Sequence, residues 1–196
     1  MGMETLVAVC LGIGMSAACG FRVFLPLLVL NLVARFGEVG VAPGLDWLSG
    51  EPATIVLAIA TTAEVLGFYI PVIDNLLGVL EAPAAIIAGT LVSASVLGDL
   101  HPALQWGAAI VAGGGTAGIV EGATVATRAA STGLTGGLAN PVVSTLELLS
   151  ALVLSLLALL VPVLAVITLI VALVLSIRYL RKIFRRRHDR PPAIPS

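Results

Sequence analysis

The chain has 196 residues and a net charge of −1, and 59% of its residues are hydrophobic while 11% are charged. Soluble domains are about 45–50% apolar and about 25% charged, so this chain carries more apolar surface than a soluble fold of its size can bury. The composition excludes an ordinary soluble enzyme or binding domain and predicts an all-α integral membrane protein, with a single transmembrane domain over residues 1–184.

Seven apolar stretches follow one another along the chain and predict its membrane segments. They are residues 5–19, 21–34, 53–73, 82–98, 103–120, 142–161 and 163–177. Since a helix needs about 20 residues to cross the hydrocarbon layer, the pattern predicts a polytopic helical bundle of six to eight segments. Pro162 divides the longest uncharged run and predicts a tight hairpin at that point.

Two parts of the pattern are not typical of lipid-facing helices. The first two apolar stretches meet at residues 18–22 without a polar loop, with Arg22 at the junction and Pro26 one turn later. Residues 121–141 combine charges, glycines and hydroxyl side chains and have too few apolar residues to span a bilayer. Irregular backbone at membrane depth must be buried in protein or line water. We therefore expect broken or re-entrant segments near residues 18–26 and 121–141, with a solvated loop as the alternative for the second.

Basic residues are concentrated at the C-terminus, where the last nineteen positions hold seven of the ten. Short basic flanks stay on the cytoplasmic side, which predicts a multi-pass protein of the cytoplasmic (inner) membrane with Arg35 and the C-terminus inside the cell. Residues 185–196 are expected to form a basic, disordered tail. The predicted partners are the lipid bilayer and its anionic headgroups rather than nucleic acid, because the basic run directly follows an apolar helix.

A stripe of small residues occurs twice and indicates an internal duplication. The two stripes, 102 residues apart, are Gly12, Ser16, Gly20 and Gly114, Gly118, Gly122. Small residues at a spacing of four let helix backbones approach closely in lipid, so all six are predicted to pack helices. We expect repeats over residues 5–98 and 103–180, although close packing alone also selects such stripes. A homo-oligomer is a further expectation.

Five charged residues within or beside apolar stretches form the predicted polar pathway. They are Arg22, Glu64, Glu121, Arg128 and Glu147. An unpaired charge in hydrocarbon costs several kcal/mol, so these side chains are expected to face the interior of the bundle and to pair with one another. The alternatives are a purely structural ion-pair network, or charges close enough to the surface to reach water.

Polar residues at the ends of apolar stretches complete the candidate site. Asp74 and Asn75 could close one end of a cavity, although a role in caps and turns explains them as well. Glu81 is interpreted as another such segment-end residue. Asn140 is predicted to be the N-cap of a helix that begins at Pro141.

Three blocks of sequence, in this order, resemble a known family. They are GMSAACGFRVFLP at 14–26, YIPVIDN at 69–75 and GGLANPVVSTLE at 136–147. With these blocks the chain resembles, over residues 5–180, the bacterial membrane family catalogued as domain of unknown function 4126. The resemblance implies a membrane fold and places the three blocks in its functional core. It implies no substrate, because the family name records no activity.

The chain has no metal-spaced histidines or cysteines, no phosphate loop and no nucleophile elbow, so we expect no metal, no cofactor and no enzymatic activity. A transporter or channel for a small solute or ion is the first hypothesis, because intramembrane ionisable residues commonly serve transport. The alternative is a non-transporting structural or lipid-interacting protein, such as an assembly factor or a scramblase. A water-accessible cavity that reaches Glu64 and Glu147 would favour transport, and a polar groove open to lipid would favour the alternative.

Overall fold

The computed structural model describes residues 2–37 and 39–188, with the side chains of residues 71–76, 79, 176–177 and 179–188 outside that description. Within these residues the chain forms helices and no strands, as its composition predicts. The helices are α1 (Met3–Cys19), α2 (Phe24–Arg35), η1 (Asp46–Ser49), α3 (Glu51–Gly67), α4 (Pro71–Val96), α5 (Pro102–Ala108), η2 (Ala109–Gly114), α6 (Gly115–Thr135), α7 (Asn140–Leu160) and α8 (Pro162–His188). A π-helical turn, η2, joins α5 to α6 without a break.

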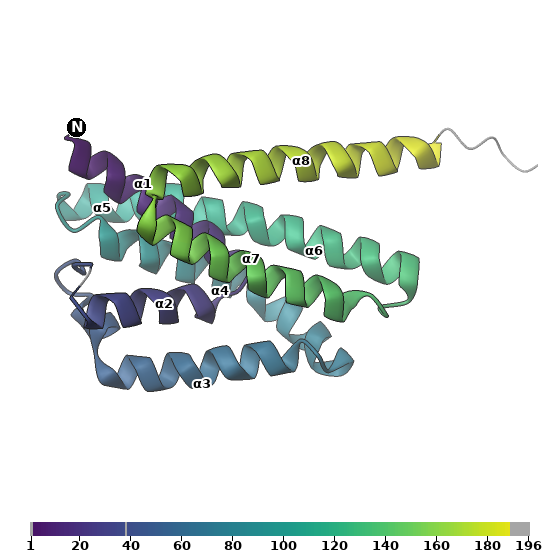
Figure 1. Cartoon of the computed structure of the whole chain (residues 1–196), viewed down its shortest axis with the longest axis horizontal. Coiled ribbons are helices and arrows are strands. Elements are labelled where there is room, and N and C mark those ends of the chain that lie inside the picture. Colours follow the sequence, from purple (N-terminus) through teal and green to yellow (C-terminus); the bar gives the residue numbers. More distant parts are fainter. Residues whose placement is uncertain (1, 38, 189–196) are drawn as a thin grey trace, which may run out of the picture.

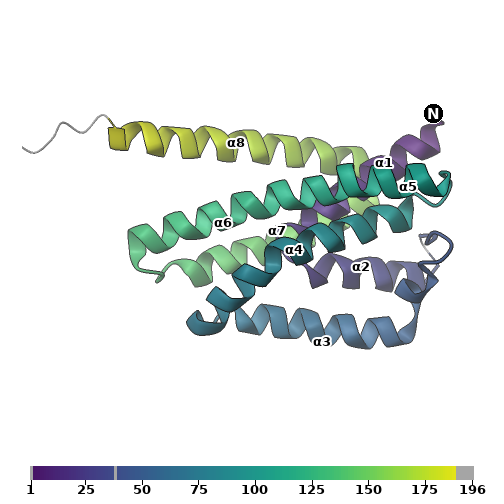
Figure 2. The same cartoon turned by 180° about the vertical axis from the view of Figure 1, so that it is seen from behind.

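The long helices lie side by side and run back and forth along the long axis of one bundle (Figures 1 and 2). α1 is the central helix, since it contacts α4, α6, α7 and α8. α3 packs on α2 at one side of the bundle, and α8 packs on α1 and α7 at the other. The C-terminal part of α1, from Gly14 to Cys19, is therefore buried on all sides.

α1 ends in the middle of the bundle, and α2 returns to the end from which α1 came (Figure 1). The backbone N–H of Gly20 donates to the carbonyl of Ala17 (3.1 Å) and that of Arg22 donates to the carbonyl of Ala18 (3.1 Å). The last turn of α1 is thus closed before the chain changes direction. The broken segment predicted near residues 18–26 is confirmed, and it leaves Arg22 at mid-length of the bundle.

This return contradicts one expectation about orientation. Arg35 is the last residue of α2 and lies 3.2 Å from Glu51, the first residue of α3. That end of the bundle is opposite to the end at which α8 finishes (Figures 1 and 2). If the long axis of the bundle crosses a membrane, Arg35 and the end of α8 lie on opposite sides of it. The reason is that α1 runs only to the middle of the bundle and α2 runs back to the same end. The tail at 189–196 lies outside the described residues.

The second predicted irregular segment, at 121–141, is wrong. α6 is a continuous helix to Thr135, and α7 begins only five residues later, at Asn140. Two of the threonines of α6 satisfy their hydroxyl groups within the helix, since Thr127 donates to the carbonyl of Ala123 and Thr135 donates to that of Ser131, each at 2.8 Å. Hydroxyl side chains can thus be satisfied inside a helix by the preceding turn. The joining residues 136–139 include two glycines with positive φ, which close the turn.

The hairpin predicted at Pro162 is present, since Val161 alone joins α7 to α8 and the two helices pack together. Pro162 is the first residue of α8, where a missing N–H is tolerated. Two of the described helices, Pro102–Thr135 and Asn140–Leu160, are long and apolar enough to cross a membrane. Shorter apolar helices are Met3–Cys19, Phe24–Arg35, Leu80–Val96 and Pro162–Leu175. The full number of spans and the internal duplication stay predictions.

Small residues permit the closest helix contacts. Of the six predicted packing positions, those in close contact with another helix are Gly12, Ser16, Gly20, Gly114 and Gly118. A methyl group added at Gly20 would lie 2.5 Å from the carbonyl oxygen of Ala117, and one at Gly114 would lie 2.5 Å from the Thr90 hydroxyl. Gly122 differs from the expectation, because a methyl group there would meet nothing within 4 Å. Gly122 is exposed while Glu121 and Thr124 are buried, so it lies on the outward side of α6.

The segment between α2 and α3 is packed onto the bundle rather than extended into solvent. The backbone N–H of Ala42 donates to the carbonyl of Ser95 at 2.7 Å, and Leu48 in η1 is buried. Asn31 in α2 is also buried; it donates from Nδ2 to the Leu48 carbonyl at 2.5 Å and accepts from the Thr54 hydroxyl at 2.7 Å. These bonds fix one end of the bundle.

Candidate functional site

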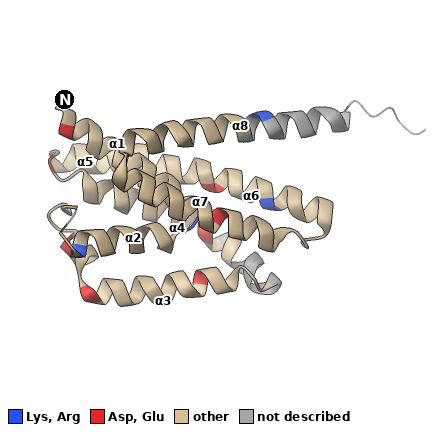
Figure 3. Cartoon of the chain, in the orientation of Figure 1, with Lys and Arg blue, Asp and Glu red and all other residues tan. Residues whose placement is uncertain are grey.

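Six charged side chains from five parts of the chain meet inside the bundle, and we call them the charge cluster. The charge cluster consists of Arg22, Glu64, Glu81, Glu121, Arg128 and Glu147. Five of the six residues are buried, and the Arg128 side chain is 14% exposed. Figure 3 shows charged positions on α3, α6 and α7 at similar positions along the bundle, on helices with few other charges. The sequence predicted all of these residues as an interior set except Glu81.

Arg22 is the centre of the cluster because the break between α1 and α2 places it there. Its side chain is 1% exposed, and its Nη2 donates to both the carbonyl (3.0 Å) and the hydroxyl (2.5 Å) of Ser144 in α7. The same nitrogen lies 3.5 Å from Glu147 Oε2, and Nη1 lies 3.9 Å from Glu81 Oε1. Arg22 thus links the α1–α2 break to α4 and α7.

Arg128 and Glu147 form the most direct ion pair of the cluster. Arg128 Nε donates to Glu147 Oε1 at 3.0 Å, and Arg128 Nη2 donates to Glu147 Oε2. A bidentate pair of this kind fixes the orientation of both planar groups and holds α6 against α7. The pairing expected between a basic side chain and Glu147 is present in the structure.

Glu64 is stabilised by backbone hydrogen bonds that cannot be predicted from the sequence. Its carboxylate accepts hydrogen bonds from the backbone N–H groups of Val23 (2.7 Å) and Phe24 (3.3 Å) at the start of α2. Val23 stands at the N-cap position of α2 and its side chain cannot cap. Glu64, from α3, therefore satisfies the free donors of α2 and lies at the positive end of that helix dipole.

Phe68 brings the two guanidiniums together. The Arg22 Cζ lies 3.9 Å and the Arg128 Cζ 4.1 Å from the centroid of the Phe68 ring, which is 2% exposed. A cation over an aromatic face is attracted by the ring quadrupole, most strongly where water is excluded. Sequence analysis missed Phe68, since one aromatic residue at the end of an apolar helix gives no distinguishing signal.

Glu81 and Glu121 are the least satisfied members of the cluster. Glu81 Oε1 and Glu121 Oε1 are buried and have no hydrogen-bond partner among the described residues, and the two negative charges act against each other. The interpretation of Glu81 as a segment-end residue is wrong, because α4 begins ten residues earlier, at Pro71, and continues through Pro83. The signal that could have identified Glu81 is its position as the one charge between Asn75 and Gly98.

Three further candidate residues lie at helix starts. Asp74 and Asn75 are in the first turns of α4, and their side chains lie outside the described residues. Asn140 is the first residue of α7 rather than its N-cap, which is Ala139. Its Nδ2 donates to the Thr132 hydroxyl of α6 at 3.2 Å, so this side chain ties the two ends of the 136–139 turn together.

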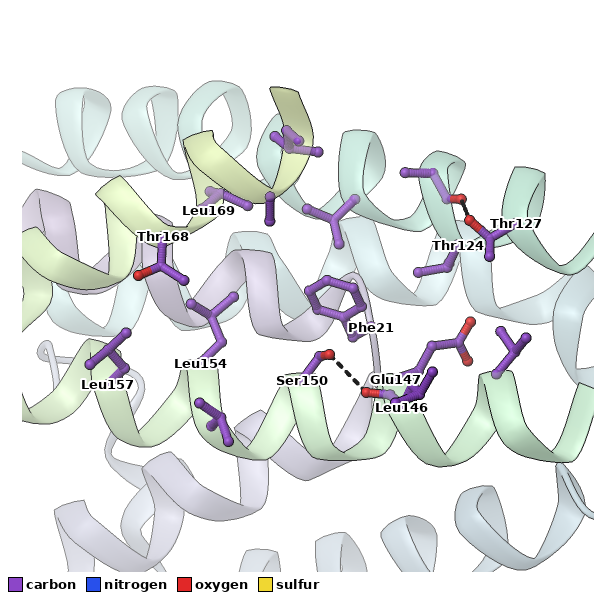
Figure 4. Close-up of a pocket in the computed structure, with 16 residues that line it drawn as sticks. Phe21, Thr124, Thr127, Leu146, Glu147, Ser150, Leu154, Leu157, Thr168 and Leu169 are labelled. Carbon is purple, nitrogen blue, oxygen red and sulfur yellow. Dashed lines mark hydrogen bonds between the residues drawn. The ribbon is translucent and has the colours of Figure 1, made fainter. Parts of the chain in front are cut away.

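One cavity approaches the charge cluster between α6, α7 and α8. It has a volume of about 340 Å³ and is lined mainly by leucine, valine and alanine, with Phe21 projecting into it from the α1–α2 break (Figure 4). Glu147 lies in its wall, together with hydroxyl groups that include those of Thr124 and Ser150. We call it the α6–α8 cavity.

A second cavity approaches the cluster from the other side, between α2, α3 and α4. It has a volume of about 530 Å³, and its polar wall residues are Glu64 and Glu81. Phe68 also lines it, while the remaining walls are apolar. This α2–α4 cavity shares no lining residue with the α6–α8 cavity, so the cluster separates two hollows in the bundle.

This arrangement of carboxyl and guanidinium groups can bind a charged or polar species and can exchange one ion-pair partner for another. No group of three or more histidine, cysteine, aspartate or glutamate side chains in the described part of the chain is placed to hold a metal ion. The cluster instead offers carboxyl and guanidinium groups with incompletely used hydrogen-bonding capacity, including Nε and Nη1 of Arg22. Buried polar atoms of this kind call for an explanation in a folded protein, and a polar species within the site is one.

Comparison with known proteins identifies the family but no activity. The chain belongs to the family described as domain of unknown function (DUF4126), whose model matches residues 9–182. No curated protein and no solved structure matches the chain. Any function must therefore be inferred from the site itself.

Proposed function

We propose that this member of a family without an assigned activity is a multi-pass protein of the cytoplasmic membrane, in which the charge cluster is the middle of a pathway for a small solute or ion. The observation that carries the proposal is the cluster itself, with four carboxyls and two guanidiniums held in the interior. A network that served only to join helices would have no need for twice as many acids as bases. Unpaired ionisable groups at membrane depth mark pathways for polar species.

The distribution of polarity supports a place in a membrane. Large apolar side chains such as Leu160 and Val111 are 79% and 77% exposed, while Arg22 is 1% exposed. An extended apolar surface of this kind is stable when lipid or another protein covers it. In the proposal the bilayer covers it, and the basic C-terminal segment lies at cytoplasmic anionic headgroups, which places the start of α1 and Arg35 on the opposite side.

The two cavities supply the access that a pathway requires. The α2–α4 cavity reaches Glu64 and Glu81, and the α6–α8 cavity reaches Glu147 from a different set of helices. The ion pairs between them close the route in this state, so passage would require Arg22 and Arg128 to change partners. Both arginines have an alternative carboxylate in the cluster, because each also interacts electrostatically with Glu81.

A second candidate function is lipid interaction without solute transport. The apolar lining of both cavities favours it, since such walls suit an acyl chain, and Glu147 would then face a lipid headgroup. The two functions differ in what crosses the membrane.

Reconstitution of the full chain in liposomes tests both functions in one preparation. Flux of protons, Na⁺, K⁺ and small organic ions is measured with entrapped dyes, and movement of fluorescent phospholipids between leaflets is measured in parallel. We expect ion or solute flux that is reduced at least tenfold by Glu147→Gln and unchanged by Glu51→Gln, a surface control. Lipid movement without flux would replace the first function by the second, and the absence of both from a folded protein would refute both.

A further inference from the structure

The charges of the cluster do not balance. With every group ionised, four carboxylates and two guanidiniums would leave two excess negative charges among side chains that are almost entirely buried. A buried carboxylate without a counter-charge is so unfavourable that the group becomes neutral instead. Two of the four acids must therefore be neutralised by something that the described side chains do not supply.

The surroundings of each carboxyl identify the two that keep their charge. Glu147 accepts two hydrogen bonds from Arg128 and lies 3.5 Å from Arg22. Glu64 accepts two backbone N–H bonds at the positive end of α2. Charge-assisted bonds and a helix N-terminus both favour the ionised form. The negative charges of Glu64 and Glu147 balance the positive charges of the two arginines. These four groups are therefore neutral together, without Glu81 and Glu121.

The two remaining acids lack such support. Glu81 interacts electrostatically with the negative Glu121 and Glu64, and Glu121 with the negative Glu147. The positive charges that act on both acids are those of Arg22 and Arg128, which Glu147 already engages. Glu81 Oε1 is 3.9 Å from the nearest guanidinium nitrogen, too far for a hydrogen bond. Glu121 Oε1 is buried without a partner among the described residues. Two carboxylates that share a buried site do not both ionise.

The hydroxyl of Thr124 gives independent support for a proton on Glu121. Thr124 has one hydroxyl proton and two oxygens of Glu121 within reach, the backbone carbonyl at 2.8 Å and Oε2 at 3.2 Å. The nearer carbonyl takes that proton, as is usual for threonine within a helix. The Thr124 hydroxyl therefore donates only weakly to Oε2, and this contact gives a carboxylate on Glu121 little stabilisation.

We propose that Glu81 and Glu121 form a proton-binding pair, in which both carboxyls hold exchangeable protons while Glu64 and Glu147 stay ionised. Each member of the pair lies beside a different cavity. Glu81 lines the α2–α4 cavity, and Glu121 contacts Thr124, which lines the α6–α8 cavity. When one carboxyl releases its proton into its cavity, it becomes a carboxylate and takes the proton of the other carboxyl. The other carboxyl then regains a proton from the opposite cavity. The inference rests on the proposed function in naming the proton as the species that the pathway carries.

Infrared spectroscopy of the full chain in lipid nanodiscs tests the pair without requiring any flux. A protonated carboxyl shows a carbonyl stretch that is separate from the bands of carboxylates and amides and shifts to lower frequency in D₂O. At neutral pH, in a sodium salt, we expect this band in the unmodified protein. Glu81→Gln and Glu121→Gln should each remove about half of it, the double variant should abolish it, and Glu51→Gln should leave it unchanged.

Two results would overturn the proposal. The first is a band that is absent or that survives in the folded double variant, because the protons would then be missing or carried elsewhere. The second is a band that appears only when Na⁺ and K⁺ are replaced by a large organic cation, because the pair would then bind a metal cation. A band that follows the expected pattern in a protein without proton flux would leave the pair established and refute the transport function alone.

Discussion

Replacement of Glu147 by glutamine tests whether the buried ion pair stabilises the bundle. Glu147 accepts both hydrogen bonds of the Arg128 fork and lies 3.5 Å from Arg22, and its side chain is 5% exposed. Glutamine keeps the volume but removes the charge, so both guanidiniums lose their nearest anion. Removal of one partner of a buried pair costs about 3–5 kcal/mol. Because Arg128 is 14% exposed and partly hydrated, we expect a loss near the lower limit, about 3 kcal/mol.

The surface pair between Arg35 and Glu51 is the matched control for this substitution. Its atoms are 3.2 Å apart, but the side chains are 37% and 70% exposed. Exposed pairs contribute about 0–1 kcal/mol, so Glu51→Gln should change the free energy of unfolding by less than about 1 kcal/mol. Equilibrium unfolding in mixed detergent micelles, followed by circular dichroism, measures both changes. Equal effects of the two substitutions would contradict the assignment of Glu147 as the ionised centre of the cluster.

Three further predictions concern packing, the aromatic contact and topology. Gly20→Ala should destabilise the bundle by about 1–3 kcal/mol, because the added methyl meets a backbone oxygen at 2.5 Å. Gly122→Ala, which has open space, should stabilise it by up to about 1 kcal/mol, and the opposite order in thermal unfolding would refute the packing assignment. Phe68→Leu removes two cation–π contacts and should lower the free energy of unfolding by about 1–2 kcal/mol. An unchanged unfolding curve would show that these contacts do not stabilise the bundle. Cysteines introduced at Phe36 and in residues 188–192 should react with an impermeant reagent from opposite sides of the membrane in intact cells, and labelling of both from one side would contradict the returning α1–α2 pair.

The sequence predicts the broad fold because composition alone separates this chain from soluble proteins. The excess of apolar residues predicts the helices, Pro162 marks a real hairpin, and an arginine between two apolar stretches marks a real break. Local polarity is a weaker guide. Residues 121–141 look like a loop or a re-entrant segment, yet most of them are helical, since hydroxyl groups bond to the preceding turn and Glu121 and Arg128 face the cluster.

Most members of the charge cluster can be predicted from the same physics, but the residues that each of them contacts cannot. A charge in an apolar stretch must be satisfied in the interior, and this requirement identified five of the six members from residue type and neighbours. Glu81 escaped because a proline two positions later suggested a helix end, whereas α4 accommodates Pro83 within its length. Phe68 escaped because one phenylalanine is not unusual at the end of an apolar helix.

What the sequence determined by itself is that a few charges occur within apolar stretches, and that they must therefore meet in the interior. What only the tertiary structure decided is which charges meet, because that depends on the direction each helix takes. The return of α2 after Arg22 sets the backbone donors of Val23 against Glu64, while Arg128 takes both oxygens of Glu147. That assignment leaves Glu81 and Glu121 each with a buried carboxyl oxygen that has no hydrogen-bond partner among the described residues, a surplus that only the three-dimensional pairing locates.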